Sequence, residues 1–167
     1  PSIKVTGTMK VDGNVAVPSG ATLNVGQSFV ITGNWNVGGS MTANGGGQMQ
    51  IDGNAAFSNS QTFQRKLTVK GNMEVQANTL TINQDVQVTK MLTVKGGATI
   101  TCNHGTFRVG DLDVEGMMQF YGAVATVDRD ATVSGTVTHK RTNSKSQTVD
   151  LRITGGLWVK NGGRIHA

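Results

Sequence analysis

The residues of this sequence that could take part in chemistry are few and far apart. The histidines are His104, His139 and His166, and the single cysteine is Cys102. None of them has the HxxxH, HxH or paired-cysteine spacing that holds zinc or iron, so no metal and no cofactor is expected in one chain. Three copies of His166 could take a metal if they met on a threefold axis. Cys102 is expected to be a small buried apolar residue.

Acidic residues form two candidate sites, each of which has a simpler interpretation. Asp111, Asp113 and Glu115 alternate along one segment and could attract calcium, which prefers oxygen ligands. The loop of the familiar calcium motifs is missing, so a solvated acidic face is expected. Asp128 and Asp130 are typical of a turn or a strand edge, because a catalytic pair of carboxylates would need a cleft.

The best basic patch consists of Lys140, Arg141 and Lys145, and it could bind phosphate. No aromatic residues are interleaved with it, as they would be in a nucleic-acid interface. We therefore expect an exposed loop over 139–148 and no nucleic-acid partner. The glycine-rich runs lack Gly-Lys-Ser/Thr and open no helix, so they do not predict a phosphate loop. The sequence contains no group of residues with the types and spacing of a catalytic site, and we expect that the chain is not an enzyme.

The sequence predicts that these candidate residues are carried by very short strands. Apolar residues recur in i, i+2 pairs about every six residues, and within a strand such a pair points to one face. Only 37% of the residues are hydrophobic and 5% are aromatic, whereas 23 are glycine. A stack of coils needs little apolar content, because each strand gives one or two side chains to a narrow interior.

A longer repeat appears when the apolar pairs are aligned on the glycine that follows them. Eight copies begin 20, 20, 18, 25, 20, 19 and 20 residues apart, which corresponds to three strands and three corners in each coil. The long interval from 67 to 92 holds an extra pair and predicts either a bulged side or a shift of faces. The copies are MKVDGNVAV from Met9, FVITGNWNV from Phe29, MQIDGNAAF from Met49, LTVKGNMEV from Leu67, LTVKGGATI from Leu92, LDVEGMMQF from Leu112, ATVSGTVTH from Ala131 and LRITGGLWV from Leu151.

Two residue columns follow from this alignment. The predicted core-packing residues are Val11, Ile31, Ile51, Val69, Val94, Val114, Val133 and Ile153. The predicted corner glycines are Gly13, Gly33, Gly53, Gly71, Gly96, Gly116, Gly135 and Gly155. Outward residues of the first strand of each copy are mixed, from Lys10 and Asp12 to Arg152 and Thr154. They predict a solvated face and not the paired threonines of an ice-binding array.

The fold expectation is all-β, with residues 1–167 as a single β-helical repeat domain. We expect a three-faced β-solenoid, as an intertwined homotrimeric β-helix or β-prism with eight repeats of about 20 residues. A single-chain solenoid is the alternative.

Repeats such as VDGNVAV, VKGNMEV and LTVKGG resemble the β-helical part of phage central tail spikes and their type VI secretion relatives. The resemblance implies a rigid spike or fibre shaft in a phage or phage-like particle. Its partners would be two further copies, other virion proteins and the host cell envelope. It also implies assembly in the bacterial cytoplasm and a final place in the virion, at the tail or particle surface. A head or tail decoration protein is a further alternative.

The glycine-marked coils also resemble bactofilins, in which a single-chain β-helix polymerises end to end into cytoskeletal filaments. Left-handed hexapeptide acyltransferases share units of six residues. Their glycine stands beside a lone inward aliphatic residue, unlike the paired pattern here, and only His104 resembles a base. These resemblances leave a trimeric shaft and an end-to-end polymer as the two main expectations.

Overall fold

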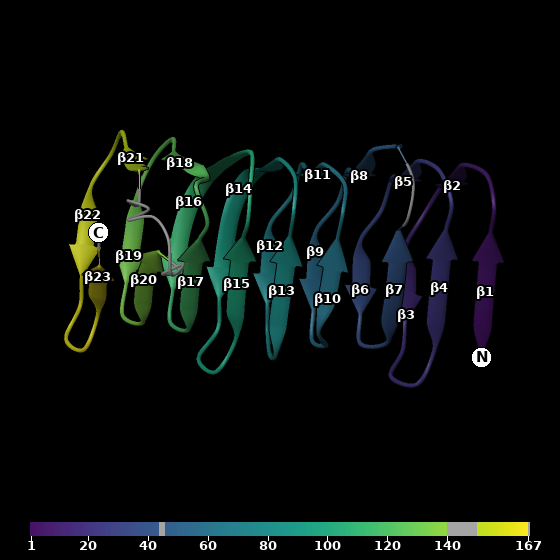
Figure 1. Cartoon of the computed structure of the whole chain (residues 1–167), viewed down its shortest axis with the longest axis horizontal. Helices are drawn as coiled ribbons and strands as arrows, with labels where there is room; N and C mark the ends of the chain where they lie inside the picture. Colours follow the sequence, from purple (N-terminus) through teal and green to yellow (C-terminus); the bar gives the residue numbers. More distant parts are fainter. Residues whose placement is uncertain (44–45, 140–149, 167) are drawn as a thin grey trace.

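The computed structural model describes residues 1–43, 46–139 and 150–166, and within them all regular structure is β-strand. The strands are short and parallel, and they stack along one long axis into a β-solenoid, from β1 (Ser2–Val5) at one end to β22 (Leu157–Val159) and β23 (Arg164–His166) at the other (Figure 1). No helix of the described chain is long and apolar enough to cross a membrane. The expectation of an all-β solenoid is confirmed.

Each coil contributes one strand to each of three faces. The first face consists of β2 (Met9–Val11), β5 (Phe29–Ile31), β8 (Met49–Ile51), β11 (Leu67–Val69), the beginnings of β14 (Val86–Val94) and β16 (Thr106–Val114), β18 (Val124–Val127) and β21 (Asp150–Ile153). The second face consists of β3 (Val15–Val17), β6 (Trp35–Val37), β9 (Ala55–Phe57), β12 (Met73–Val75), the ends of β14 and β16, β19 (Ala131–Val133) and β22.

The third face consists of β1, β4 (Thr22–Val25), β7 (Ser40–Ala43), β10 (Gln61–Phe63), β13 (Thr79–Ile82), β15 (Thr99–Cys102), β17 (Met117–Phe120), β20 (Thr136–His139) and β23. Its backbone ladder is interrupted once, between β7 and β10. There the buried side chain of Gln61 accepts a hydrogen bond from the backbone N–H of Met41 at 2.9 Å and donates one to the carbonyl of Gly39 at 2.6 Å. The side-chain amide of Gln61 therefore replaces part of the backbone hydrogen bonding that is missing between β7 and β10.

Successive coils of the same chain supply each other's hydrogen-bond partners. On the first face, for example, Leu67 and Val69 are in register with Met49 and Ile51 below and with Val86 and Val88 above. Pairing of this kind satisfies the backbone N–H and C=O groups of the inner coils. The ladder is made within one chain.

The long sequence interval after residue 67 corresponds to a shift of faces. Leu67 pairs with Val86, while Leu92 pairs with Met73 on the second face. The strand β14 runs through the corner between the two faces, and its pairing with β16 shifts register between Val88 and Met91. The copies that begin at residues 92, 112 and 131 therefore lie on the second face, whereas the copy at 151 is back on the first.

The interior is a continuous column of inward side chains. The predicted core residues Ile31, Ile51, Val69, Val94, Val114 and Val133 are all 0% exposed. Val11 and Ile153 lie in the end coils and are half-buried. Its largest fully buried side chain is Trp35, whose ring makes edge contacts with Phe29 and Phe57 at centroid distances of 5.2 and 5.1 Å. Burial of this column is the main force that holds the coils together.

The predicted corner glycines occupy two different corners. Gly13, Gly33, Gly53, Gly71 and Gly155 lie between the first and second faces. Gly96, Gly116 and Gly135 lie between the second and third faces, as a consequence of the shift.

The Gly-Asn corners are joined by a ladder of asparagine side chains. The Oδ1 atom of Asn14 accepts a hydrogen bond from the N–H of Asn34 at 2.7 Å, and Asn34 and Asn54 accept in the same way from Asn54 and Asn72, both at 2.8 Å. This stacking explains why asparagine follows glycine in the first four copies. Each amide oxygen satisfies a backbone donor that the corner would otherwise leave free.

Candidate functional site

The residues that were candidates for metal binding are separated in the structure. His104 is exposed beside the third face, and His166 is exposed on β23. His139 ends β20, where it is in register with Phe120. Cys102 is 1% exposed, and burial raises the pKa of its thiol far above the ordinary value. Among the described residues, no three His, Cys, Asp or Glu side chains come together in a group that could hold a metal ion.

The acidic candidates are engaged in ion pairs between coils. Asp111 accepts hydrogen bonds from the guanidinium of Arg129, at 2.6 Å from Nη2, and this contact lowers the pKa of the carboxyl. Asp128 pairs with Arg108 at 2.9 Å, which raises the pKa of that guanidinium. These pairs join neighbouring coils, and their positions fit the turn and strand-edge interpretation.

The remaining acidic candidates also have neighbouring partners or lie on strands. Asp130 accepts a hydrogen bond from the N–H of Gly156 at 2.8 Å. The Oε1 atom of Glu115 forms an ion pair with Nζ of Lys95 at 3.5 Å. Asp113 is an outward residue of β16. The predicted basic patch at Lys140, Arg141 and Lys145 lies outside the described residues, as does the loop expected there except for His139.

A buried arginine that the sequence analysis missed joins two coils. Arg65 is 2% exposed, and its Nη2 atom donates to the carbonyl oxygens of Val25 at 3.0 Å and Gly26 at 3.1 Å, while Nη1 donates to Gln27. Desolvation lowers the pKa of this guanidinium. Because its partners are backbone carbonyls nearly 40 residues away, Arg65 is a structural clamp and not a catalytic group.

The third face is an uncharged surface along most of the solenoid. Its outward residues form two columns, because i and i+2 of each strand point the same way. One column contains Thr22, Ser40, Ser60, Thr79, Thr99, Met117 and Thr136, and the other contains Asn24, Thr42, Thr62, Thr81, Thr101, Gln119 and Thr138. From β4 to β20 none of these outward residues is charged. We call this surface the threonine face.

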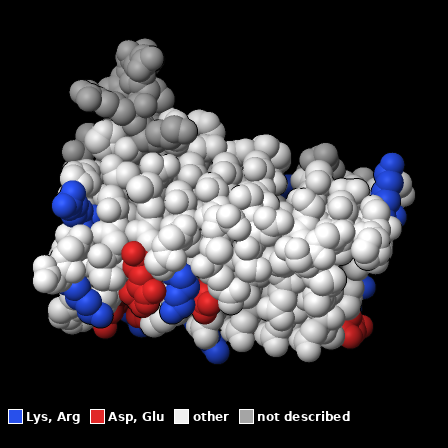
Figure 2. All heavy atoms as spheres, turned by 90° about the horizontal axis from the view of Figure 1, so that it is seen from below, with Lys and Arg blue, Asp and Glu red and all other residues white. Residues whose placement is uncertain are grey.

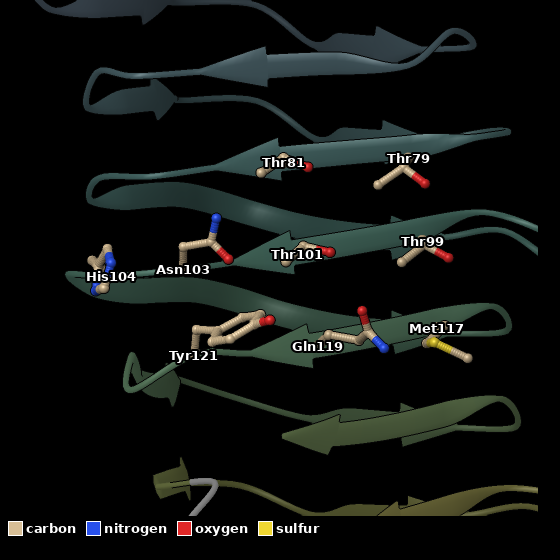
Figure 3. Close-up of a pocket in the computed structure, with 9 residues that line it drawn as sticks. All are labelled: Thr79, Thr81, Thr99, Thr101, Asn103, His104, Met117, Gln119 and Tyr121. Carbon is tan, nitrogen blue, oxygen red and sulfur yellow. The ribbon is translucent and has the colours of Figure 1, made fainter. Parts of the chain in front are cut away.

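Two shallow hollows lie over the middle of the threonine face. One, of about 570 Å³, lies over Thr79, Thr81, Thr99 and Thr101 and is bounded by Met117, Gln119, Tyr121, Asn103 and His104. Figure 3 shows the four threonines in two columns on neighbouring strands, with Met117, Gln119 and Tyr121 along the next strand and corner. The other hollow, of about 400 Å³, lies over Ser40, Thr42, Ser60 and Thr62 and shares Thr79 and Thr81 with the first.

Charged side chains are concentrated elsewhere. In Figure 2 most blue and red atoms lie along one long edge and near the two ends, and the broad middle of the view is white. The outward residues of the other two faces include Lys10, Arg108 and Arg152 on the first and Glu74 and Asp113 on the second. The solenoid thus has chemically different sides.

The two ends of the solenoid expose inward side chains. Ile3 is 59% exposed, whereas its register partner Leu23 in the next coil is 4% exposed. Val159 is 50% exposed, and its partner Val133 is 0% exposed. Among the described residues, the strands of both end coils pair on one side only, so at each end the outer edge of these strands presents backbone N–H and C=O groups without a strand partner.

Comparisons of the chain with known protein families, curated proteins and solved structures found no match in any of the three. The function must therefore be inferred from the geometry of the solenoid, its ends and its threonine face.

Proposed function

We propose that this chain is a structural protein that forms a rigid rod and associates end to end with further copies of itself. Rigidity follows from the continuous interior and from the parallel ladders along the faces. The proposal includes no catalytic role and no cofactor.

The observation that carries this proposal is the exposure of the interior at both ends. A strand with unpaired backbone groups is a template for pairing with another chain. Stacking the β1 end of one copy on the β23 end of another would cover Ile3, Leu157 and Val159, which are 59%, 46% and 50% exposed. It would also continue each face with parallel strands, as in the bactofilins that the coils resemble.

Both ends of the solenoid carry charges of both signs with a surplus of basic residues, so we expect salt to strengthen the stacking. In the end coil with β21 to β23, Nη2 of Arg152 forms an ion pair with Asp150 at 2.8 Å. In the opposite end coil, Nζ of Lys10 lies 3.8 Å from Oδ1 of Asp12. Basic residues outnumber acidic ones at each end, with Lys4 and Lys10 against Asp12 at one and Arg152, Lys160 and Arg164 against Asp150 at the other. The exposed apolar interior, and not charge, therefore favours association between the two ends.

A trimeric phage spike or shaft is the second candidate, and the feature that favours it is the resemblance of the Gly-Asn units to those of phage spikes. This candidate comprises an intertwined homotrimer of eight repeats of about 20 residues, located in the virion and bound to other virion proteins and the host envelope. In that arrangement the hydrogen bonds that now join coils of one chain would be exchanged for bonds between chains. His166 could then meet its copies on the axis.

Light scattering over a dilution series tests the proposal. We expect a mass that rises with concentration in steps of 17.5 kDa, and we expect Val159→Lys to abolish the rise because it places a charge in the stacked interior. Thr132→Lys, an outward change one coil further in, is the matched control and should leave the association unchanged.

A discrete trimer that is stable to dilution would replace the proposal with the spike or shaft candidate. A monomer at every concentration would overturn both. An association that Val159→Lys leaves intact would show that the ends are not the contact.

A further inference from the structure

We propose that the threonine face is an ice-binding surface, on which ranks of hydroxyl and methyl groups order water in an ice-like arrangement. This function is separate from end-to-end association, because it uses the side of the rod and not its ends. The face was not evident from the outward residues of the first strand of each sequence copy, since those first strands lie on the other two faces.

The first step of the argument is the regular spacing of the hydroxyl groups. Thr79, Thr81, Thr99 and Thr101 are in register on adjacent strands. Neighbouring strands in a sheet are about 4.8 Å apart, and residues i and i+2 of one strand are about 6.6 Å apart. The ranks therefore form a two-dimensional lattice whose spacings are close to those between oxygen atoms on faces of an ice crystal.

The second step is the extent and uniformity of this lattice. Four consecutive ranks have Ser or Thr at both outward positions: Ser40 and Thr42, Ser60 and Thr62, Thr79 and Thr81, and Thr99 and Thr101. Met117 and Gln119 interrupt the pattern for one strand, and Thr136 and Thr138 resume it. From β10 to β20 the backbone beneath is held by continuous parallel ladders, whereas between β7 and β10 the ladder is interrupted and the side chain of Gln61 bridges the two coils.

The third step is the chemistry of the face. A threonine hydroxyl can anchor a water molecule, while its methyl group restricts the orientation of first-shell water. Charged side chains would impose tight hydration shells that differ from ice, and none projects from this face between β4 and β20. The same uniformity is absent from the first and second faces, where Lys10, Arg108 and Glu74 point outward.

The larger hollow also opens a largely covered threonine of this face to water. Thr101 is only 8% exposed, yet it lines the hollow of about 570 Å³ between the two columns. Figure 3 shows Thr101 between Thr81 and Gln119, beside Asn103. The Thr101 hydroxyl is not one of the fully buried, unpaired polar atoms of the described residues, so water in the hollow can reach it and form a hydrogen bond with it.

A polysaccharide is the other ligand class that a long polar face could take. Sugar rings are usually bound by stacking on aromatic side chains, and among the described residues that line the two hollows only Tyr121 is aromatic. Acidic residues that would accept hydrogen bonds from sugar hydroxyls do not line them either. The regular, uncharged ranks favour ordered water over a glycan.

The test measures incorporation of the purified chain into a slowly growing ice hemisphere, together with the gap between melting and freezing temperatures. We expect the wild-type chain to enter the ice and to shape the crystals. Thr81→Lys places a charge where the two hollows meet and should remove most of both effects. Thr68→Lys, at an outward position of the first face, is the matched control and should behave as wild type.

Circular dichroism of both variants establishes that any loss is not caused by unfolding. Exclusion of the folded wild-type chain from ice would overturn the proposal, and so would full activity in Thr81→Lys. Binding to an immobilised polysaccharide that Thr81→Lys abolishes, without any effect on ice, would assign the face to a glycan instead. Val159→Lys, which disrupts only the proposed end contact, should still enter the ice.

Discussion

Replacing Val69 by aspartate is expected to prevent the chain from folding at neutral pH. Val69 is 0% exposed, and its register partners Ile51 and Val88 are 0% and 1% exposed, so no water reaches the new carboxylate. An unpaired charge in an interior costs about 3–5 kcal/mol, which is comparable to the whole stability of a small domain. Loss of the cooperative unfolding transition, followed by circular dichroism during urea titration, would be the expected result.

Thr68→Asp is the matched control for this change. Thr68 is the neighbouring residue on the same strand, but it points outward between Gln50 and Gln87. The control introduces the same charge on the solvent side and is expected to leave the free energy of unfolding nearly unchanged. Equal stabilities of the two variants would contradict the inward orientation of Val69.

Replacing Gly53 by alanine is expected to destabilise the corner between the first and second faces. A methyl group there would lie 2.5 Å from the carbonyl oxygen of Gly33 and 2.7 Å from Oδ1 of Asn34. The carbonyl oxygen of Gly33 belongs to the backbone and cannot move without disturbing the neighbouring coil. Overpacking of this kind costs about 1–3 kcal/mol, and displacement of the asparagine oxygen would also weaken its bond to the N–H of Asn54.

Gly96→Ala supplies the comparison within the same set of corner glycines. No atom lies within 4 Å of a methyl group built on Gly96. We expect this variant to have the stability of the wild type, or to be slightly more stable because the unfolded chain loses freedom. The measurement is the midpoint of thermal unfolding of both variants, and a larger loss at Gly96 than at Gly53 would refute the arrangement of the corners.

Much of the fold could be predicted from the sequence, because each strand needs only one apolar pair and each corner a few small residues. The pairs from Leu67 to Val94 all belong to strands of the structure. The shift of faces was left open, since the corner at Thr89, Lys90 and Met91 contains no glycine. A register between strands depends on which side chains stack across coils, and one strand alone does not determine it.

The threonine face was missed because the alignment followed the glycine that ends an apolar pair. Its strands have the pattern TLTI at Thr79 and TITC at Thr99, 20 residues apart. That repetition is visible in the sequence and could have predicted the face if every strand of a coil had been compared. Only the register of β13 with β15 places the two patterns side by side.

Arg65 could not be assigned from sequence, since an arginine near a corner is ordinarily expected to be solvated. Its burial depends on carbonyl oxygens of Val25 and Gly26, which only the stacking of coils brings within reach. The glycines at 46 and 47 belong to the intervening coil and line a hollow with Arg65. Long-range contacts of this kind follow from the fold and not from local pattern.

Cross-linking of two cysteines introduced at Gln50 and Thr68 tests most directly whether one chain stacks its own coils. These residues are outward register partners on β8 and β11, and adjacent strands are about 4.8 Å apart, within the range that a disulfide can span. The native Cys102 is buried and remote from them in sequence. A single-chain solenoid predicts a cross-linked monomer on a denaturing, non-reducing gel. Cross-linked dimers and trimers in place of that monomer would contradict it, because the partner strand would then belong to another chain.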